Sequence, residues 1–422
     1  MSKFDKGRTS KLIDLCESIT DCHHSTPKWT NEGKIVIRNF NIKNGKLLLD
    51  EISYTDEATY QERISRSQPY PGDLIITREA PMGEVCIIPD GIECCLGQRL
   101  VLIKPNLNKI NNKYLLYALL SEYTQKQIQQ SNNTGSIVSN LRIPLLKNLD
   151  IPLNNNQDKI AAVLSYLDDK IEINNRINSE LENLAKTIYD YWFVQFDFPD
   201  ENGKPYKSSG GKMVYNQELK REIPAGWEVG TLSKLGDIAG GSTPSTKNPL
   251  NFCHNGTAWI TPKDLSLNVG NKFISRGELD VTDAGIKEAS LKIYPKGTIL
   301  LSSRAPIGYM AVARNEVTTN QGFKSFIPNK RFSIPFVYYT VKNSMNAIIK
   351  QASGSTFKEV SLTTLKDNVY ICLPSNTVVD FYTKKVNSIF KQQDILEQEN
   401  QQLTQLRDWL LPMLMNGQIT VK

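Results

Sequence analysis

The sequence predicts an α+β protein with two similar mixed α/β domains separated by two long helices, which pack against each other as an antiparallel intramolecular coiled coil. Three observations support this prediction. One sequence repeat occurs twice along the chain, a heptad pattern free of Gly and Pro follows each copy, and a linker rich in turn residues separates the copies. A length of 422 residues is sufficient for two or three domains.

The repeat is clearest at two tetrads that each follow a turn and a short strand. Ala80-Pro81-Met82-Gly83 and Ala305-Pro306-Ile307-Gly308 lie 225 positions apart (80 against 305). A glutamine follows each tetrad at a similar offset, Gln98 in the first copy and Gln321 in the second. Such regular offsets indicate a duplication, so we predict one domain over residues 1–156 and its copy over residues 226–375.

A long helix is expected after each copy, over residues 157–192 and 376–411. Apolar residues recur there every seven positions, which is the spacing of a helix that pairs with another helix. Each stripe must be buried, and the other helix can bury it in antiparallel orientation because a globular domain lies between the two. The alternative is that both are amphipathic core helices of their own domains. The expected seam residues are Ile160, Leu167, Asn174, Leu181, Ile188, Tyr382, Ile389, Leu396, Leu403 and Leu410.

A companion stripe is expected three residues after each of these rows. It holds Val163, Ile177, Leu184 and Tyr191 in the first helix, and it is weaker in the second, where Lys385, Gln392 and Glu399 precede Leu406 and Met413. Asn174 is a polar seam residue of the kind that fixes register. Pro412 should end or kink the second helix, which leaves residues 412–422 as a tail. Residues 193–225, rich in turn residues, form the linker between the copies.

Composition describes an ordinary globular protein with a small basic excess. The chain has 50 Lys and Arg against 44 Asp and Glu, a formal net charge of +6, which permits a nucleic-acid partner. No apolar run approaches the ~18 residues of a membrane span, and the N-terminus lacks the apolar core of a secretion signal. Seven Cys at irregular spacing do not suggest a disulfide framework. These features favour a cytoplasmic protein.

Motifs for catalysis are missing. There is no phosphate loop, no dinucleotide loop of the G-x-G-x-x-G type and no nucleophile elbow. Pro199-Asp200 with Glu218-Leu219-Lys220 loosely fits a metal-dependent nuclease, but these residues lie in the linker. Cys16, Cys22, His23 and His24 are zinc ligands by residue type, without the spacing of a zinc finger. We therefore expect no catalytic, cofactor-binding or metal-binding residue in this chain.

Polar side chains in the turns that bound the strands are candidate DNA contacts. Arg can form paired hydrogen bonds with guanine, and Asn or Gln can form them with adenine, while Ser, Thr and Lys can bind phosphates. The alternative for any single Arg is a surface ion pair. Two similar but non-identical binding units on a rigid helix pair would read two half-sites at a fixed spacing. The candidates are Arg38, Asn39, Thr77, Arg78, Gln98, Arg99, Thr261, Lys263, Ser302, Ser303, Arg304, Asn320, Gln321 and Lys324.

These features resemble the specificity (S) subunit of type I restriction-modification systems, the HsdS family, over essentially the whole chain. Phe252-Cys253-His254 departs from the aromatic-rich loop that is common in the family, which leaves that loop's geometry open. The most specific segments are residues 22–29, 36–40 and 76–84 in the first copy, residues 240–245, 259–265, 302–308 and 319–323 in the second, the inter-repeat segment 196–212 and the ending 410–417.

The resemblance implies two target-recognition domains, each followed by a spacer helix, and no catalytic centre. Such a subunit binds a two-part asymmetric sequence in double-stranded DNA with an unread spacer between the half-sites. It joins two modification (methyltransferase) subunits that carry S-adenosylmethionine and methylate adenine, and restriction (translocase/endonuclease) subunits that use ATP and Mg²⁺ can join as well. Two alternatives stay open: a stand-alone nuclease or methyltransferase, and a coiled-coil scaffold without a DNA role.

Overall fold

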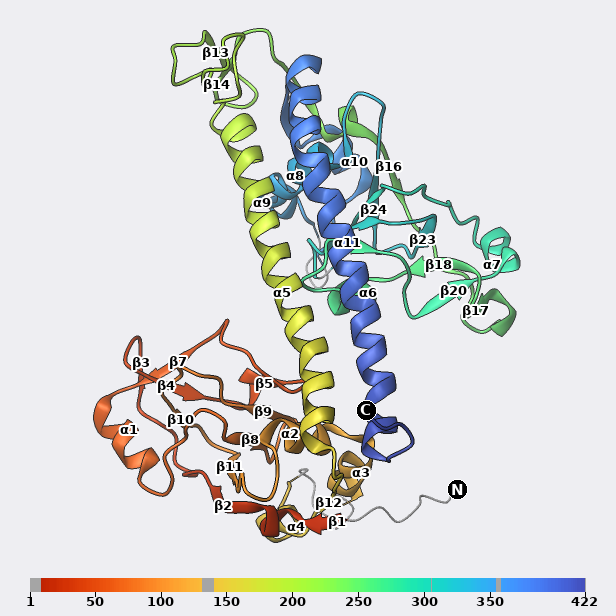
Figure 1. Cartoon of the computed structure of the whole chain (residues 1–422). Coiled ribbons are helices and arrows are strands. Elements are labelled where there is room, and N and C mark those ends of the chain that lie inside the picture. Colours follow the sequence, from red (N-terminus) through yellow and green to blue (C-terminus); the bar gives the residue numbers. More distant parts are fainter. Residues whose placement is uncertain (1–8, 131–139, 305, 354–357, 422) are drawn as a thin grey trace. The chain divides into compact units, whose positions relative to one another are not determined.

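The computed structural model describes residues 9–130, 140–304, 306–353 and 358–421 (Figure 1). The chain divides into two compact units. Unit 1 comprises residues 1–172 and 401–422, and unit 2 comprises residues 173–400. Each unit therefore contains one mixed α/β domain together with a segment of each long helix. Within the described ranges, no helix is long and apolar enough to cross a membrane.

The domain of unit 1 contains two four-stranded sheets. In the first sheet the order is β2-β11-β8-β9 with antiparallel neighbours, and in the second it is β3-β7-β4-β10 with β10 parallel to β4. The strands, including the short pairs β1–β12 and β5–β6, are β1 (Thr9–Lys11), β2 (Cys16–Asp21), β3 (Trp29–Thr30), β4 (Lys34–Ile37), β5 (Ile42–Lys43), β6 (Lys46–Leu47), β7 (Ser53–Thr55), β8 (Leu74–Thr77), β9 (Val85–Ile87), β10 (Cys94–Leu96), β11 (Leu100–Pro105) and β12 (Asp150–Pro152). The helices are α1 (Glu57–Ile64), α2 (Asn112–Leu120), α3 (Glu122–Gln130) and α4 (Ile143–Lys147).

The domain of unit 2 repeats both strand orders and adds a fifth strand, β19, which pairs parallel with β22 at the edge of the first sheet. Its sheets run β16-β24-β21-β22-β19 and β17-β20-β18-β23, again with one parallel pair in the second sheet, β18 with β23. This shared topology confirms the duplication. The strands, including the pairs β13–β14 and β15–β25, are β13 (Met213–Asn216), β14 (Arg221–Pro224), β15 (Glu228–Thr231), β16 (Gly236–Gly240), β17 (Phe252–Cys253), β18 (Thr257–Ile260), β19 (Phe273–Ile274), β20 (Leu279–Val281), β21 (Ile299–Leu301), β22 (Met310–Ala313), β23 (Val317–Thr319), β24 (Lys324–Pro328) and β25 (Tyr370–Leu373). The helices are α6 (Pro262–Leu267), α7 (Asp283–Glu288), α8 (Ile334–Asn343), α9 (Met345–Lys350) and α10 (Leu362–Asp367).

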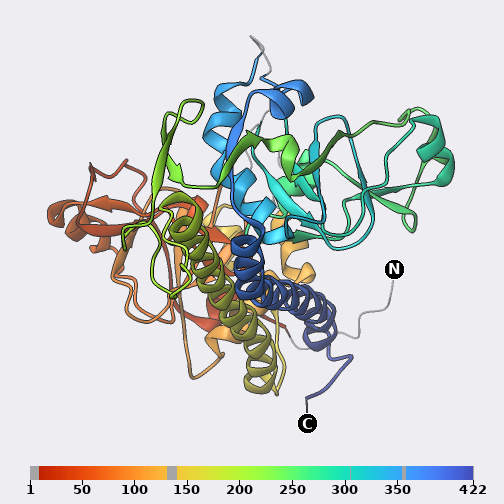
Figure 2. The ribbon, with the colours of Figure 1, turned by 90° about the horizontal axis from the view of Figure 1, so that it is seen from above.

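The long helices are α5 (Gln157–Tyr189), which continues as a short π-helix over Asp190–Val194, and α11 (Asn376–Met415). Their segments pack antiparallel within each unit (Figures 1 and 2). In unit 2, Asn174 of α5 donates a hydrogen bond to Asn400 of α11 at 2.9 Å, and further along α5 Tyr189 contacts Tyr382. In unit 1, Asp168 forms an ion pair with Arg407 at 2.8 Å. The expected antiparallel pairing is confirmed.

Each helix is also part of the core of the domain in its unit. In unit 1, Ile160 and Leu164 of α5 are buried in the same apolar cluster as Leu115 of α2. In unit 2, Tyr382 and Phe390 of α11 belong to the main apolar cluster of that domain. The two descriptions offered by the sequence, paired helices and core helices, therefore both apply.

The expected companion stripe was wrong by one position in both helices. Residues four positions after the expected seam residues are buried or half-buried. In the expected companion stripe, three positions after the seam residues, Ile177 is 39% and Leu184 49% exposed. Positions i+3 and i+4 flank the same row on a helix, so the pattern alone leaves the choice open. Packing on the adjacent domain selects i+4. The residues of the observed stripes are Leu164, Ile171, Asn178 and Ala185 in α5, and Val386, Gln393, Asn400, Arg407 and Leu414 in α11.

Pro412 does not end α11, which continues to Met415. Proline removes one backbone donor, but Leu414 and Met415 are buried in the core of unit 1, and this packing holds the last turn in place. The expectation that the helix ends at residue 411 was therefore wrong. Within the linker, β13 and β14 form a hairpin.

Candidate DNA interface

A buried hydroxyl holds the tetrad loop of each domain. Thr77 Oγ1 accepts the backbone N–H of Glu84 at 3.0 Å. At the equivalent position, Ser302 Oγ accepts the backbone N–H groups of Gly308 and Tyr309 at 3.1 and 2.9 Å. The loops contain Gly83 and Gly308 with φ of 88° and 108°, values that strain residues with a side chain. Ala305, the first residue of the second tetrad, lies outside the described residues.

Three candidate DNA contacts are fully buried: Thr77, Ser302 and Ser303. Ser303 Oγ donates to the carbonyl of Gly322 at 3.2 Å, so this hydroxyl also bonds the protein's own backbone. The sequence shows a hydroxyl beside a turn but not whether that hydroxyl already has a buried partner. We therefore correct the expectation for these three side chains, since they have no accessible surface to offer to DNA in this structure.

Two acidic residues bind the candidate arginines Arg78 and Arg99 of the first domain. Arg78 forms hydrogen bonds with both carboxylate oxygens of Asp21, at 2.9 and 2.7 Å. Arg99 pairs with Glu79 at 3.1 Å, and Asn39 donates to the Glu79 carbonyl at 2.6 Å. The side chain of Gln98 bonds to the His24 carbonyl, and His24 lies 3.1 Å from Asp21. The structure thus binds Arg78 and Arg99 to carboxylates, whereas Asn39 and Gln98 donate to backbone carbonyls.

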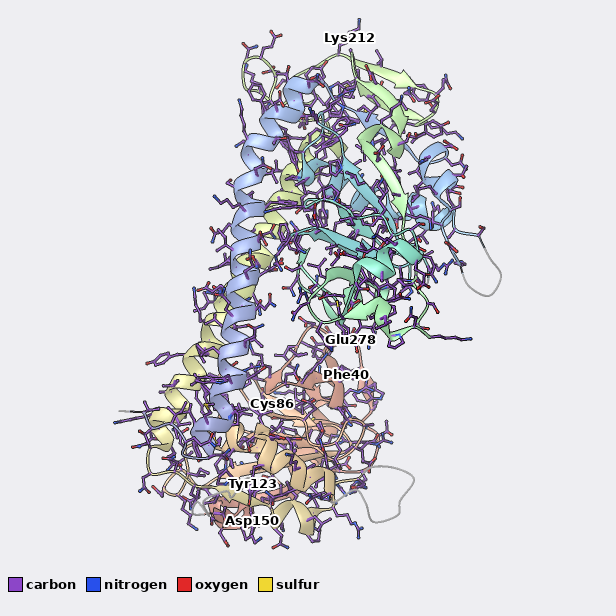
Figure 3. All side chains as sticks on the ribbon, turned by 90° about the vertical axis from the view of Figure 1, so that its right-hand side faces the viewer. Phe40, Cys86, Tyr123, Asp150, Lys212 and Glu278 are labelled. Atoms are coloured by element: carbon purple, nitrogen blue, oxygen red, sulfur yellow. The ribbon has the colours of Figure 1, made fainter. Side chains whose placement is uncertain are left out.

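In the second domain, Glu359 has the same role. Arg304 and Lys324 pair with it at 3.0 and 3.3 Å. Burial would raise the pKa of Glu359, but the hydrogen bonds from Arg304 and Lys324 outweigh burial and lower it. Lys263 lies apart from this group, paired with Glu278 at 2.6 Å, and Figure 3 shows Glu278 at an edge of the domain.

The polar candidates of the second domain are engaged in turns. Asn320 accepts the backbone N–H of Gly322 at 2.9 Å, and Gln321, which is exposed, bonds to Thr243. Thr261 caps α6, with its hydroxyl bonded to Asp264 at 2.6 Å. No local pattern pointed to the carboxylates Asp21, Glu79 and Glu359, because each lies far along the chain from at least one of its partners.

Arg38 differs from the other candidate cations. Arg78, Arg99, Lys263, Arg304 and Lys324 all have a carboxylate partner. Across the described part of the chain, no carboxylate forms an ion pair with Arg38. Its guanidinium carbon instead lies 5.0 Å from the ring centre of Trp29 and 4.7 Å from that of Phe40.

A buried polar network joins the domain of unit 2 to its two helix segments. Lys272, which precedes β19, lies 2.6 Å from Glu182 of α5, and its ammonium bonds to Gln393 of α11 at 2.7 Å. The backbone N–H of Lys272 donates to Glu397 of α11 at 2.7 Å, and Arg314 pairs with the same carboxylate at 2.7 Å. Burial would raise the pKa of Glu182, but Lys272 and Lys342 lower it to about 2. This network fixes the domain on both helices.

Unit 1 has a simpler junction at the corresponding place. Tyr117 of α2 donates to Asp168 of α5 at 2.7 Å, and Arg407 of α11 donates to the other oxygen of Asp168 at 2.8 Å. Burial raises the pKa of Tyr117, and the negative charge of Asp168 raises it further. The phenol therefore stays protonated and keeps its donor.

The helix segments expose apolar side chains, which in unit 2 lie on the side turned away from the domain. In unit 2, Ile177 lies five residues, or about 140° around the helix, from Glu182, which contacts the domain. Ile395 of α11 is two residues, or about 160°, from Glu397. The exposed apolar residues of the helices are Ile173, Ile177, Leu184, Phe381 and Ile395 in unit 2, and Tyr166, Leu406 and Trp409 in unit 1. We call these residues the outer helix face.

Comparison with known proteins places these features in one family. The sequence profile of the type I restriction modification DNA specificity domain matches the chain twice, over residues 6–183 and 224–405. The specificity subunit of the type I restriction enzyme HindI from Haemophilus influenzae is 28% identical over 446 residues, which cover 91% of this chain and 94% of that relative. The MjaIX specificity subunit from Methanocaldococcus jannaschii is 45% identical over 185 residues, and this match spans only 42% of each chain.

Among solved structures, the S subunit of a type I restriction-modification system from M. genitalium has the same fold. The TM-score is 0.59 at 17% identity, and the alignment covers 98% of each chain. The two profile matches together include both mixed domains and most of both long helices. The chain therefore belongs to the family of type I restriction modification DNA specificity domains, of which it carries two copies.

Proposed function

We infer that this chain is the DNA sequence-specificity subunit of a type I restriction-modification complex and that it binds a bipartite asymmetric target through its two recognition domains. The duplication carries this inference. Both domains share the same strand orders apart from the added strand β19, yet the side chains after equivalent strands differ: Arg38 follows β4, whereas Thr261 follows β18. A scaffold repeated with different side chains suits two different half-sites, and two-unit readers use the spacing between half-sites as a filter.

We propose that the chain contributes no catalytic group and binds no cofactor or metal, and that S-adenosylmethionine, ATP and Mg²⁺ belong to partner subunits. Two observations support this proposal. Asp200, the acid of the nuclease-like pattern, accepts the backbone N–H groups of Asn202 and Lys204 at 2.8 Å each, as in an ordinary turn. Burial raises the pKa of the Cys16 thiol to about 12, which disfavours the thiolate that a zinc ligand requires. The cytoplasm is the proposed location.

The chain alone and the chain with its modification partner should behave differently towards DNA. We expect N6-methyladenine at a two-part sequence in cells that express both proteins, because the partner catalyses the methylation and this chain selects the DNA sequence that is methylated. The purified chain should neither cut nor methylate DNA in the presence of Mg²⁺ and S-adenosylmethionine, and calorimetry should show no stoichiometric binding of S-adenosylmethionine or ATP. Cutting or methylation by the chain alone would favour the enzyme alternative. No DNA footprint with the partner present would favour the scaffold alternative.

We further propose that two modification subunits bind the outer helix face, one at each unit, and that restriction subunits join through them. Apolar side chains exposed at helical spacing are typical of surfaces that bind a partner helix. In unit 2, Ile177 and Leu184 are seven residues apart on α5, and Phe381 and Ile395 are fourteen residues apart on α11, so both sets follow the heptad period. Unit 1 carries its own set, which fits one modification subunit for each unit.

Replacing Ile177 and Leu184 together by Glu should prevent assembly with the modification subunit. Each buried apolar side chain contributes about 1.5–3 kcal/mol to an interface, so the loss should exceed tenfold in affinity. Both side chains are exposed in the free chain, so its thermal stability should change little. Co-elution with the modification subunit in size-exclusion chromatography measures the effect.

The matched control for this variant is Arg176→Glu with Asn183→Glu. It introduces two carboxylates at the same seven-residue spacing, on exposed positions next to Ile177 and Leu184, without removing an apolar side chain. The control should still co-elute with the modification subunit. Unchanged co-elution of the Ile177→Glu, Leu184→Glu variant would contradict the proposal.

A further inference from the structure

We propose that Arg38 is a specificity-determining residue of the first recognition domain and that it reads a guanine in the first half-site, with Trp29 and Phe40 as positioning residues. This inference rests on the proposed DNA-recognition function. It goes beyond that function because it assigns one side chain, one class of base and one half-site.

The absence of a competing acid is the first argument. Within the described ranges, each of the other five candidate cations has a carboxylate partner, and Arg38 has none. A carboxylate occupies the same N–H groups that guanine would use, so a paired arginine must break that contact before it can bind a base. The hydrogen bond from Arg38 Nη1 to the Ser53 hydroxyl is long, at 3.4 Å, and leaves the other N–H groups of the guanidinium available.

The two aromatic rings are the second argument. Trp29 is 44% and Phe40 46% exposed, so the two rings form an accessible aromatic surface beside Arg38. The guanidinium carbon lies over both rings, at 5.0 and 4.7 Å from their centres. Figure 3 shows Phe40 at the edge of the first domain. Stacking restricts the rotamers of the long arginine side chain and leaves the N–H edge of its planar fork free for paired hydrogen bonds.

The backbone beneath Arg38 is the third argument. The N–H of Arg38 donates to Asn41 Oδ1 at 2.9 Å, and the amide of Asn41, which is buried, donates to the carbonyls of Leu48 and Glu51 at 2.9 and 3.0 Å. The turn after β4 is therefore held at both ends. A fixed turn places the arginine precisely enough for base recognition, which requires two hydrogen bonds in one plane.

The second domain has the same turn with a different residue. There the N–H of Thr261 donates to Asp264 at 2.8 Å, at the position equivalent to Asn41, but Thr261 is short and its hydroxyl is bonded to the same carboxylate. The shared backbone and the different side chain indicate that this position has a reading role only in the first domain. The effect of Arg38 should accordingly be confined to one half-site.

The test uses the assembled complex of this chain with its modification subunits. The methylation rate is measured on duplexes that carry each of the four bases at each position of both half-sites. For Arg38→Ala we expect the preference for guanine at one position of the first half-site to fall about 5- to 150-fold, with the second half-site unchanged. Arg38→Lys should show a similar loss, because lysine keeps the charge but not the bidentate fork. Trp29→Ala with Phe40→Ala should show a smaller loss at the same position.

Arg66, an exposed arginine of the same domain that bonds the Cys22 carbonyl and is over no aromatic ring among the described contacts, provides the matched control Arg66→Ala, which should leave the preference intact. Continued discrimination at the second half-site shows that the Arg38 variants are folded. A uniform loss on all sequences that Arg38→Lys restores would mean a phosphate contact and would overturn the assignment. Unchanged discrimination, or a change in the second half-site, would also overturn it. If the wild-type complex methylates no two-part sequence, the proposed function itself is wrong.

Discussion

Exchange of residues 226–375 for the corresponding segment of a relative is expected to replace one half of the methylated sequence and to leave the other half unchanged. The physical reason is that the second domain has its own apolar core and its own strand-end side chains, none of which belong to unit 1. The exchange therefore alters one recognition surface completely. Mapping of N6-methyladenine in cells that express the chimera with the modification subunit measures the result.

The junction with the helices decides whether such a chimera works. Lys272 and Arg314 lie inside the exchanged segment, while their partners Glu182 and Glu397 lie outside it. A donor that lacks these cations would leave the buried Glu397 without Arg314 and the half-buried Glu182 without Lys272; loss of one partner of a fully buried pair costs about 3–5 kcal/mol. The chimera should therefore keep Lys272 and Arg314, and a matched chimera with Lys272→Ala should unfold at a lower temperature. A chimera that retains both cations and changes both half-sites would contradict the independence of the two domains.

Insertion of one heptad into each long helix is expected to lengthen the unread spacer and to leave both half-sites unchanged. The sites between residues 172 and 173 and between residues 400 and 401 keep the Asp168–Arg407 ion pair and the Asn174–Asn400 hydrogen bond within their own units. Seven residues preserve the seam period and add about 10 Å to each helix. At about 3.4 Å per base pair, the spacer should grow by at most about three base pairs.

A heptad inserted into α5 alone is the control for this experiment. It leaves α11 seven residues short, so the seam contacts of one unit can form only if those of the other are broken, and methylation should fall sharply at every spacer length. Methylome sequencing of both variants distinguishes the outcomes. A doubly inserted variant that methylates the original spacing, or that recognises altered half-sites, would show that the helices do not set the spacer.

The candidate site was predictable only in part. Turn position and residue type led to Arg38, Arg99 and Gln321, which are exposed. The same reasoning also selected Thr77 and Ser303, which are buried because hydroxyls that satisfy the protein's own backbone have the same local sequence as hydroxyls that face solvent. The carboxylates that neutralise most candidate cations could not be predicted, since strand pairing brings them in from distant parts of the chain.

The duplication, the two long helices and their antiparallel pairing were predictable from sequence patterns alone. Repeated motifs and a seven-residue apolar period can be recognised along the chain without knowing which distant segments pack together. Three features depend instead on packing between distant segments: which flank of each seam is buried, whether Pro412 ends its helix, and which cation is left without an acid. On a helix, residues three and four positions after a seam residue flank it on opposite sides, so the heptad pattern allows either Ile177 or Asn178 to be the buried neighbour of Asn174. The domain that packs against the helix buries Asn178 and leaves Ile177 at the surface.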